Sequence, residues 1–384
     1  MLSNFKSFYM IRRSKTINRC QISKKKDLSR ILSLGYLPPV NNYHPIDKPQ
    51  NEETFFLTDL MYSKSSKLVQ LKTIVDKEVI FPKSYPYTSS TTKILRENFK
   101  ELYKECKKIL NLKKNDLIVD IGSNDGNLLS NFVSNHRVLG VTPENIGKIA
   151  IKRGINTLLN YFDNKTSNVI VKKYGKAKLV TATNVFAHID NINSMMKNIL
   201  KILDNDGYFV TESHYLVSLI KTIQYDTIYH EHMRYYSLIS LKYLFDKYNL
   251  KIFHAKKIPT HGGSIRVYVT KNKKVEETKT LKKILKDEKK FFNTKTFSEF
   301  SNKVVLSKIK RVILPGTILS QICSGLPSFF NVVFISSSAF DNISLVSCDI
   351  DIYVGTFFNV FPSLCNSMFS FSITAILASV SDFK

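Results

Sequence analysis

The sequence contains no tryptophan and only five cysteines in 384 residues. The cysteines are scattered and no two of them have CxxC spacing; they are Cys20, Cys106, Cys323, Cys348 and Cys365. This distribution excludes a disulfide framework and shows no zinc knuckle, so we expect no metal ion. Cysteines of this kind are typical of a reducing compartment, and we expect a cytoplasmic protein.

Acidic residues are also scarce: 31 Asp and Glu stand against 57 Lys and Arg, which gives a formal net charge of +26. Such an excess indicates either attraction to a polyanion or a surface on which solvated lysines are spread. The lysines lie in separate short runs, such as Lys24–Lys26 and Lys172–Lys173, rather than in one basic stripe. We therefore favour the second interpretation and expect no nucleic-acid partner.

Lysine and arginine are missing altogether from residues 312–383. Three explanations of this tail compete. We favour a shifted reading frame or gene rearrangement; a membrane-seeking segment is second, and a small β domain is third. Residues 352–381 carry no charge and are long enough to span a bilayer, but Pro362 and many polar residues weaken that interpretation, and we expect no membrane association.

The changes in composition divide the chain into four parts. We expect an irregular N-terminal module, a central domain, a helical linker and an atypical tail, with bounds at residues 1–95, 96–275, 276–311 and 312–384. The oligomeric state is not determined by the sequence.

The central domain begins with a short run of apolar and β-branched residues, Leu117–Ile121, which is typical of a buried strand. Gly122 and Gly126 follow it, and Asn124 with Asp125 would cap a helix over residues 127–133. A strand, a glycine turn and a helix start together present backbone N–H groups to a nucleotide-like ligand. An ordinary strand-to-helix turn is the alternative.

Strand and helix patterns then alternate along the chain. We expect a helix over 89–112, a second over 192–203, a turn over 204–207, and six further strands at 137–141, 156–159, 177–182, 208–211, 251–258 and 264–270. This pattern predicts an α/β fold with a doubly wound, seven-stranded sheet. Ligands of such sheets bind at the carboxyl ends of the strands, where Asn184, His188 and residues 212–215 would lie.

Residues 225–232, Tyr-Asp-Thr-Ile-Tyr-His-Glu-His, form the densest group of titratable side chains in the sequence. A buried core segment would not tolerate so many of them. A surface loop is one alternative. A metal site is another, although the H-E-x-x-H spacing is absent and H-x-H needs a third ligand.

Several of these motifs together carry a family resemblance. The pattern D-x-G-x-x-x-G at Asp120–Gly126 resembles the first motif of class I S-adenosylmethionine (SAM) methyltransferases. Residues 225–232, the F-A-H-I motif at His188 and the H-G-G-S motif at His261–Ser264 resemble the C-methyltransferases that act on nucleotide-linked 4-keto-deoxysugars. The resemblance implies a Rossmann-like SAM-methyltransferase sheet, SAM as cofactor and a nucleotide-sugar substrate methylated at the carbon beside its ketone.

The resemblance also implies roles for individual residues. His232 would be the base that removes a proton from carbon, Glu231 would orient or polarise its neighbours, and Tyr229 with His188 would donate to the enolate oxygen. The implied substrate-binding residues are Tyr85, Tyr87, His230 and His261. The implied cofactor-binding residues are Asp120, Gly122, Ser123, Asn124, Gly126, Thr142 and Asn184. Arg234 and Arg266 are candidates, by charge alone, for the diphosphate.

The chain departs from the family at three places. The family's N-terminal module holds zinc with four cysteines, whereas Cys20 is accompanied here by Ser23, Ser63 and Ser66. Serine is a poor zinc ligand, so we predict a zinc-free and looser module. Thr142 replaces the acid that grips the cofactor ribose, although Glu144 could substitute for it. The tail shows no sign of the family's third, Rossmann-like domain.

Two alternative functions remain open. The lost cysteines, Thr142 and the tail favour a degenerate methyltransferase-like protein that is kept for binding or is decaying. A nucleic-acid methyltransferase would explain the positive charge, but no Asn/Asp-Pro-Pro-Tyr/Phe motif is present.

Overall fold

The computed structural model describes residues 13–41, 53–80, 88–143, 145–293 and 295–312. The chain forms two units, Met1–Ser298 and Glu299–Lys384, and each is considered by itself. The predictions about Tyr85, Tyr87, Glu144 and the tail fall outside the described residues.

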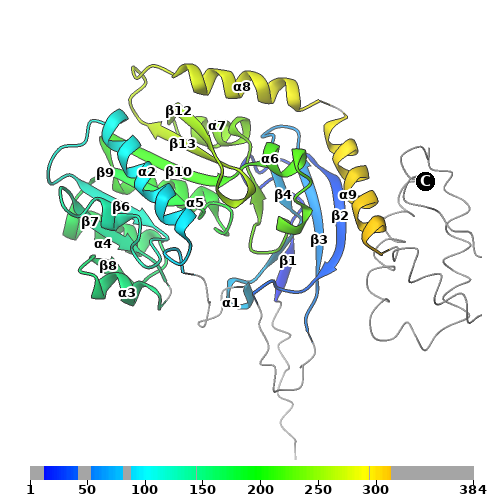
Figure 1. Ribbon diagram of the computed structural model, residues 1–384, viewed down its shortest axis with the longest axis horizontal. Helices are drawn as coiled ribbons and strands as arrows, with labels where there is room; N and C mark the ends of the chain where they lie inside the picture. Colours follow the sequence, from blue (N-terminus) through cyan, green and yellow to red (C-terminus); the bar gives the residue numbers. More distant parts are fainter. Residues whose placement is uncertain (1–12, 42–52, 81–87, 144, 294, 313–384) are drawn as a thin grey trace, which may run out of the picture. The chain divides into compact units, whose positions relative to one another are not determined.

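A seven-stranded sheet forms the centre of the first unit (Figure 1). Its strand order is β12-β13-β10-β9-β6-β7-β8. Neighbouring strands run parallel except around β13, which is antiparallel to both β10 and β12. The bounds are β6 (Leu117–Ile121), β7 (Arg137–Val141), β8 (Thr157–Leu158), β9 (Ala177–Thr183), β10 (Leu203–His214), β12 (Lys251–Ile258) and β13 (Ser264–Thr270). The predicted doubly wound α/β fold is confirmed.

The alternating side chains of β6 explain why this interior strand is buried on both faces of the sheet. All five of its residues are buried. Val119 and Ile121 belong to the core cluster shared with α5 and α7, whereas Ile118 belongs to a second cluster shared with α2. The helices are α1 (Lys77–Ile80), α2 (Lys93–Ile109), α3 (Gly147–Lys152), α4 (Asn164–Tyr174), α5 (Ile192–Ile202), α6 (Leu216–Lys221), α7 (Leu238–Lys247), α8 (Lys279–Phe291) and α9 (Thr296–Val312).

The N-terminal module is a β structure rather than the irregular segment expected. β2 (Leu28–Leu37), β3 (Phe56–Ser63) and β4 (Val69–Leu71) form a sheet in the order β11-β4-β3-β2, and β1 (Ser14–Thr16) pairs with β5 (Thr73–Val75). The edge strand β11 (Arg234–Tyr235) comes from the region directly after His232. The module is therefore continuous with the segment that carries the candidate base.

Two local predictions around the glycine turn are wrong. The helix expected over 127–133 is only a 3-10 turn at Leu129–Asn131, because the side chains of Ser130 and Asn131 bond to the backbone carbonyl of Asn127. Asn124 and Asp125 do not cap it; both instead accept hydrogen bonds from Ser89.

The strand expected at residues 208–211 is longer in the structure, where β10 begins at Leu203. The predicted turn at residues 204–207 lies within β10, and the pairing with β9 is interrupted there.

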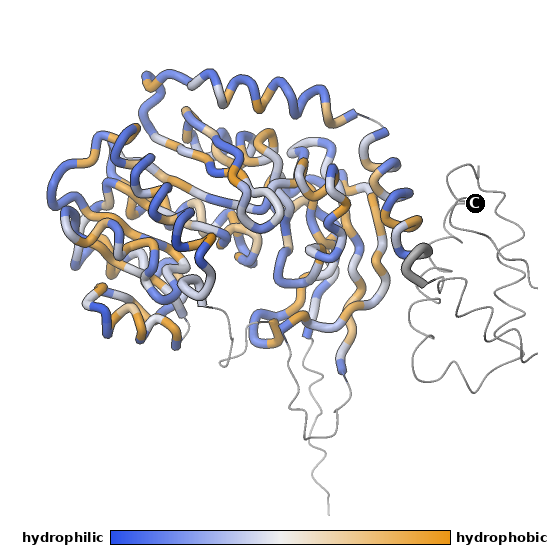
Figure 2. The backbone as a smooth tube through the Cα atoms, in the orientation of Figure 1, coloured by the Kyte–Doolittle hydropathy of each residue, from blue (hydrophilic) through white to orange (hydrophobic). Residues whose placement is uncertain are grey.

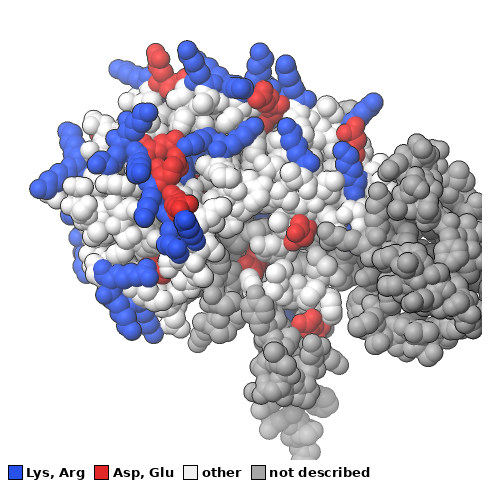
Figure 3. Space-filling model, in the orientation of Figure 1, with Lys and Arg blue, Asp and Glu red and all other residues white. Residues whose placement is uncertain are grey.

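Helix α8 has a polar outer face. Along α8, hydrophilic residues alternate with buried Leu281 and Ile284, as Figure 2 shows for this helix. On the face in Figure 3, Lys and Arg are spread over several elements with acidic residues among them. None of the described helices combines the length and hydrophobicity needed to cross a bilayer.

Candidate active site

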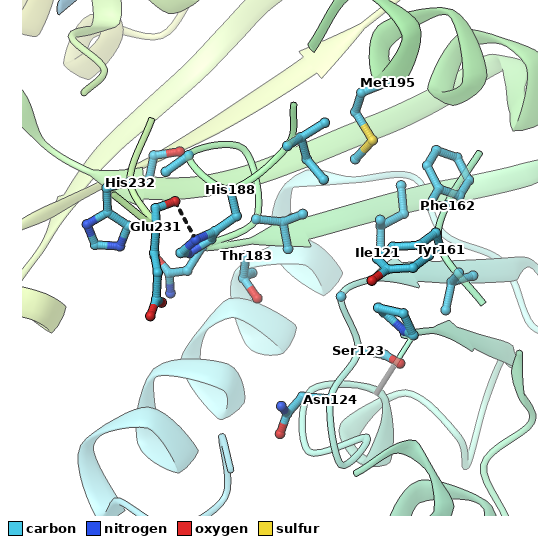
Figure 4. Close-up of a pocket in the computed structure, with 18 of the residues that line it drawn as sticks. Ile121, Ser123, Asn124, Tyr161, Phe162, Thr183, His188, Met195, Glu231 and His232 are labelled. Carbon is cyan, nitrogen blue, oxygen red and sulfur yellow. Dashed lines mark hydrogen bonds between the residues drawn. The ribbon is translucent and has the colours of Figure 1, made fainter. Parts of the chain in front are cut away.

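A cavity of about 1070 Å³ lies at the carboxyl ends of the sheet strands. Its wall contains the glycine turn after β6, the segments after β8, β9 and β10, and the stretch around residues 227–232. Figure 4 shows two groups of side chains facing this space: His188, Glu231 and His232 on one side, and Ile121, Tyr161 and Phe162 on the other. The cofactor and base motifs, which are about 100 residues apart in the sequence, therefore share one cavity.

Gly122 lies on the wall of this cavity, in the turn after β6. It has a φ of +75°, and a Cβ at this position would lie 2.4 Å from Cγ2 of Val185. Its N–H donates to the carbonyl of Val141 at 2.8 Å, which ties the turn to β7. Only glycine satisfies both constraints, so the turn packs directly against Val185, another residue of the cavity wall.

Two polar side chains flank the turn. The Ser123 hydroxyl is buried and has no hydrogen-bond partner within the described part of the chain, although the residue lines the cavity. Burial raises the pKa of Asp120 to about 7, against the opposing effect of a 2.6 Å hydrogen bond from Thr181. An orphaned hydroxyl and a carboxyl whose pKa is raised by burial are groups that a polar ligand would satisfy.

Five of the seven cofactor-binding predictions lie on the cavity wall: Asp120, Gly122, Ser123, Asn124 and Asn184. The other two do not. A Cβ on Gly126 would meet Ile155 and Ala150, so this glycine serves helix packing. Thr142 is fully buried, and its methyl group lies against Gly147.

Sequence reasoning missed several residues of the wall. Tyr161 and Phe162 follow β8, and Met195 lies on α5. Ser213, within the stretch 212–215 that was expected at the strand ends, is the penultimate residue of β10, and its buried hydroxyl has no partner in the described structure. The N-terminal module adds Lys77, whose ammonium lies 4.1 Å from the centre of the Tyr161 ring. The position shortly after a parallel strand is the signal that could have found Tyr161 and Phe162.

The candidate base, His232, is held by two hydrogen bonds. Its Nδ1 lies 3.3 Å from the carbonyl oxygen of Thr227, and its Nε2 lies 3.3 Å from the hydroxyl of Tyr229. A carbonyl can only accept, so Nδ1 carries the proton and Nε2 carries the lone pair. His232 can therefore accept a proton on the nitrogen next to Tyr229.

His188 stands beside His232, with 4.9 Å between the ring centres. Its Nδ1–H donates to the backbone carbonyl of Glu231 at 2.9 Å, the dashed line in Figure 4. Burial lowers the pKa of His188 to about 4. Burial also lowers the pKa of His232 well below its usual value, and the neighbouring His188 lowers it further. Both imidazoles are neutral at neutral pH, which a base requires.

Glu231 connects the N-terminal module to this group. The side chain of Asn41 donates to its carboxylate at 2.5 Å, and both residues line the cavity. His261 also lines the cavity, and its Nε2 lies 3.3 Å from the amide nitrogen of Asn184. The structure therefore brings Tyr229, Glu231, His188, His232 and His261 into one site.

Three other predictions are corrected by burial. His230 does not line the cavity: its ring packs against Phe56, and its Nε2 lies 3.2 Å from the hydroxyl of Thr58. Arg234 is 1% exposed and donates to the backbone carbonyls of Phe186 and Ile189. Arg266 is fully buried among acidic residues. Neither arginine is accessible to a diphosphate.

Comparison with known proteins agrees with this geometry. Residues 94–255 match a family model described as a methyltransferase domain, and residues 20–81 match one described as "Putative zinc binding domain". The central region is therefore similar in sequence to methyltransferase domains.

One curated relative extends beyond this domain. The C-methyltransferase NovU of Streptomyces niveus is 32% identical over 254 residues, which cover 66% of this chain and 60% of the relative. The match thus spans about three fifths of that relative's length.

Solved structures give weaker similarities. Magnesium protoporphyrin IX methyltransferase of Synechocystis PCC 6803, solved with SAH, has 11% identity and a TM-score of 0.37, covering 46% of this chain and 83% of that one. The N-methyltransferase NodS of Bradyrhizobium japonicum has 11% identity and a TM-score of 0.35, covering 47% and 97%. We base no assignment on these two.

Proposed function

We propose that the chain is a SAM-dependent C-methyltransferase that methylates the carbon beside the keto group of a nucleotide-linked 4-keto-deoxysugar. The observation that carries the proposal is the single cavity that holds both Gly122 and His232. The printed name of the 32% identical relative, a C-methyltransferase, supports carbon as the acceptor. The sugar substrate is supported by the motifs at residues 225–232 and 261–264.

The residues of the wall fit SAM. The glycine turn lies on the cavity wall, and the buried Ser123 hydroxyl and the Asp120 carboxyl provide polar partners. The rings of Tyr161 and Phe162 offer aromatic faces for an adenine. When bound, SAM would supply a methyl group activated by its positively charged sulfur.

His232 is the base in this proposal. Its Nε2 takes a proton from the substrate carbon, and the electron pair of the C–H bond moves toward the carbonyl, whose oxygen becomes an enolate oxygen. Tyr229 already lies 3.3 Å from Nε2, so its hydroxyl can turn to donate to that oxygen. The Nδ1–H of His188 is held by the Glu231 carbonyl, so His188 braces this stretch rather than donating.

The test is His232→Ala, measured with a nucleotide-linked 4-keto-deoxysugar in D₂O. Without SAM, the native chain should exchange the hydrogen beside the ketone for deuterium, and the variant should lose this exchange by about 10²–10⁴-fold. SAM binding by calorimetry should stay unchanged. His136→Ala is the control, since His136 lies outside the cavity wall. Undiminished exchange in His232→Ala would remove this residue from the mechanism.

A degenerate binding protein is the second candidate, and Thr142 favours it. Thr142 stands where an acid would bind the cofactor ribose, but it has no carboxylate, is buried and does not line the cavity. Calorimetry of the native chain with SAM separates the two: absence of binding would support the degenerate protein, and binding at micromolar concentration would support the enzyme.

A further inference from the structure

The match to a zinc-binding family model begins at Cys20, where the structure forms a tight turn. The N–H of Lys24 returns to the carbonyl of Cys20 at 2.9 Å, and Lys24 has a φ of 66°. The N–H of Ser23 points at the Cys20 sulfur, 3.4 Å away. An N–H directed at the first side chain and a left-handed fifth residue define this turn.

A second turn, at residues 63–66, has the same construction. The N–H of Lys67 returns to the carbonyl of Ser63 at 2.9 Å, and Lys67 has a φ of 58°. The N–H of Ser66 points at the Ser63 hydroxyl, 3.4 Å away. Two matching turns therefore present their side chains to each other, which is the backbone arrangement that a tetrahedral metal would need.

The donor atoms do not fit zinc. The four positions supply one thiol, Cys20, and three hydroxyls, Ser23, Ser63 and Ser66. Structural zinc is held by thiolates and imidazoles, and a neutral hydroxyl does not replace a thiolate. Within the described residues, no group of three or more His, Cys, Asp or Glu could hold a metal ion.

Hydrogen bonds connect the two turns instead. The Cys20 sulfur lies 3.0 Å from the hydroxyl of Ser66, which donates to Ser63 at 3.1 Å. Ser65 donates to Ser23 at 3.1 Å. Cys20, Ser63 and Ser66 are fully buried. The first two contacts join positions that would otherwise be bound to one metal, and Ser65 adds a bond from the second turn to the first.

Asp27 completes the group. Its carboxylate accepts the Ser63 hydroxyl at 3.0 Å and the backbone N–H of Ser65 at 2.6 Å. Burial would raise the pKa of Asp27, but the bonds from Ser65 and Ser63 outweigh it and lower the pKa. The carboxylate is therefore stabilised in its charged form against the second turn.

We propose that a metal-free group of hydrogen-bonded side chains, the staple, joins the two turns in place of zinc and keeps the backbone geometry of a metal site. We call its residues the serine cluster: Cys20, Ser23, Ser63, Ser66 and Asp27. The staple goes beyond the proposed reaction, because it concerns how the module is held rather than what the cavity converts.

The staple also holds the module against the segment after the base. Gln21, inside the first turn, is 7% exposed and donates to the backbone carbonyl of Met233 at 3.3 Å. Its side-chain oxygen accepts a hydrogen bond from Arg234. The first turn thus supports the chain one and two residues beyond His232.

Metal analysis of the full chain tests the geometry. The native chain, purified with excess ZnCl₂ and desalted, should retain no stoichiometric zinc. The triple variant Ser23→Cys, Ser63→Cys, Ser66→Cys should retain about one zinc per chain and melt at higher temperature with zinc than after chelation. The matched control carries alanine at the same three positions. Stoichiometric zinc on the native chain would overturn the proposal. So would a triple-cysteine variant that folds but retains no zinc after treatment with ZnCl₂.

Thermal melting of Asp27→Asn tests the staple without any metal. The loss of the charged hydrogen bonds should lower Tm by roughly 3–10 °C. Asp287→Asn makes the same charge change on the exposed face of α8 and should leave Tm within about 1 °C. Equal melting temperatures for the two variants would show that the serine cluster does not hold the turns together. This outcome does not depend on any enzymatic activity.

Discussion

Arg266 offers the sharpest test of how the site is supported. Its guanidinium is fully buried; Nε donates to Glu212 at 2.6 Å, and Nη1 donates to Glu105 at 2.7 Å and to Glu101. Glu212 is itself fully buried at the end of β10, next to the cavity residue Ser213. The acids at 101 and 105 come from α2, so the arginine ties this helix to the sheet below the cavity.

Replacing Arg266 with methionine would leave Glu212 buried without its cation. Burial already raises the pKa of Glu212, and Arg266 is the main group opposing that rise. Removing one partner of a buried ion pair costs about 3–5 kcal/mol. For a domain of this size each kcal/mol lowers Tm by about 2–4 °C, so Arg266→Met should melt roughly 6–20 °C below the native chain.

The double variant Arg266→Met, Glu212→Gln separates the buried charge from other losses. A neutral glutamine can still accept from Asn98, which donates to Glu212 at 2.9 Å. The double variant should therefore be more stable than the sum of the single changes by about 1.5–3 kcal/mol in urea unfolding. Arg30→Met, at an exposed position of β2, is the control. A Tm of Arg266→Met equal to that of the control would refute the reasoning.

Two further predictions concern the cavity. Gly122→Ala combines a positive φ with an overlap on Val185, so SAM affinity measured by calorimetry should fall about 5–30-fold. Adding Val185→Ala removes the overlap but not the backbone strain, so it should restore only part of the affinity. An unchanged affinity in Gly122→Ala would contradict the role of the glycine turn in SAM binding. For the pH profile, His232 must be neutral, and its pKa lies well below 6.5, so proton exchange should stay constant as pH falls to 6.5 and decline only below it; an acid limb above pH 6.5 would exclude this base.

The central fold could be predicted because its signals are local. Leu117–Ile121 is a continuous apolar run, and a strand buried on both faces needs nothing else to be recognised. The glycine turn was equally visible, since the conformation at Gly122 depends on the residue itself. The helix after it was not, because Ser130 and Asn131 bond to the backbone and tighten the turn.

The N-terminal sheet could not be predicted in the same way. β2 is mostly exposed or half-buried, and its sequence shows no clear alternation. β4 has three residues and is paired on one side by β11, which lies more than 160 residues later in the sequence. Strands this short are stabilised by partners that no local window contains.

The site shows the same division between local and distant information. The family resemblance indicated that His232, Tyr229 and His188 belong together, and the chemistry of a base and a donor is consistent with these residue types. Charge alone misplaced Arg234 and Arg266. A free arginine and a buried one look identical in sequence, and the difference is made by backbone carbonyls and by acids on another element. A buried arginine needs such partners to be stable, so its role follows only once the helix that supplies them has been placed against the sheet.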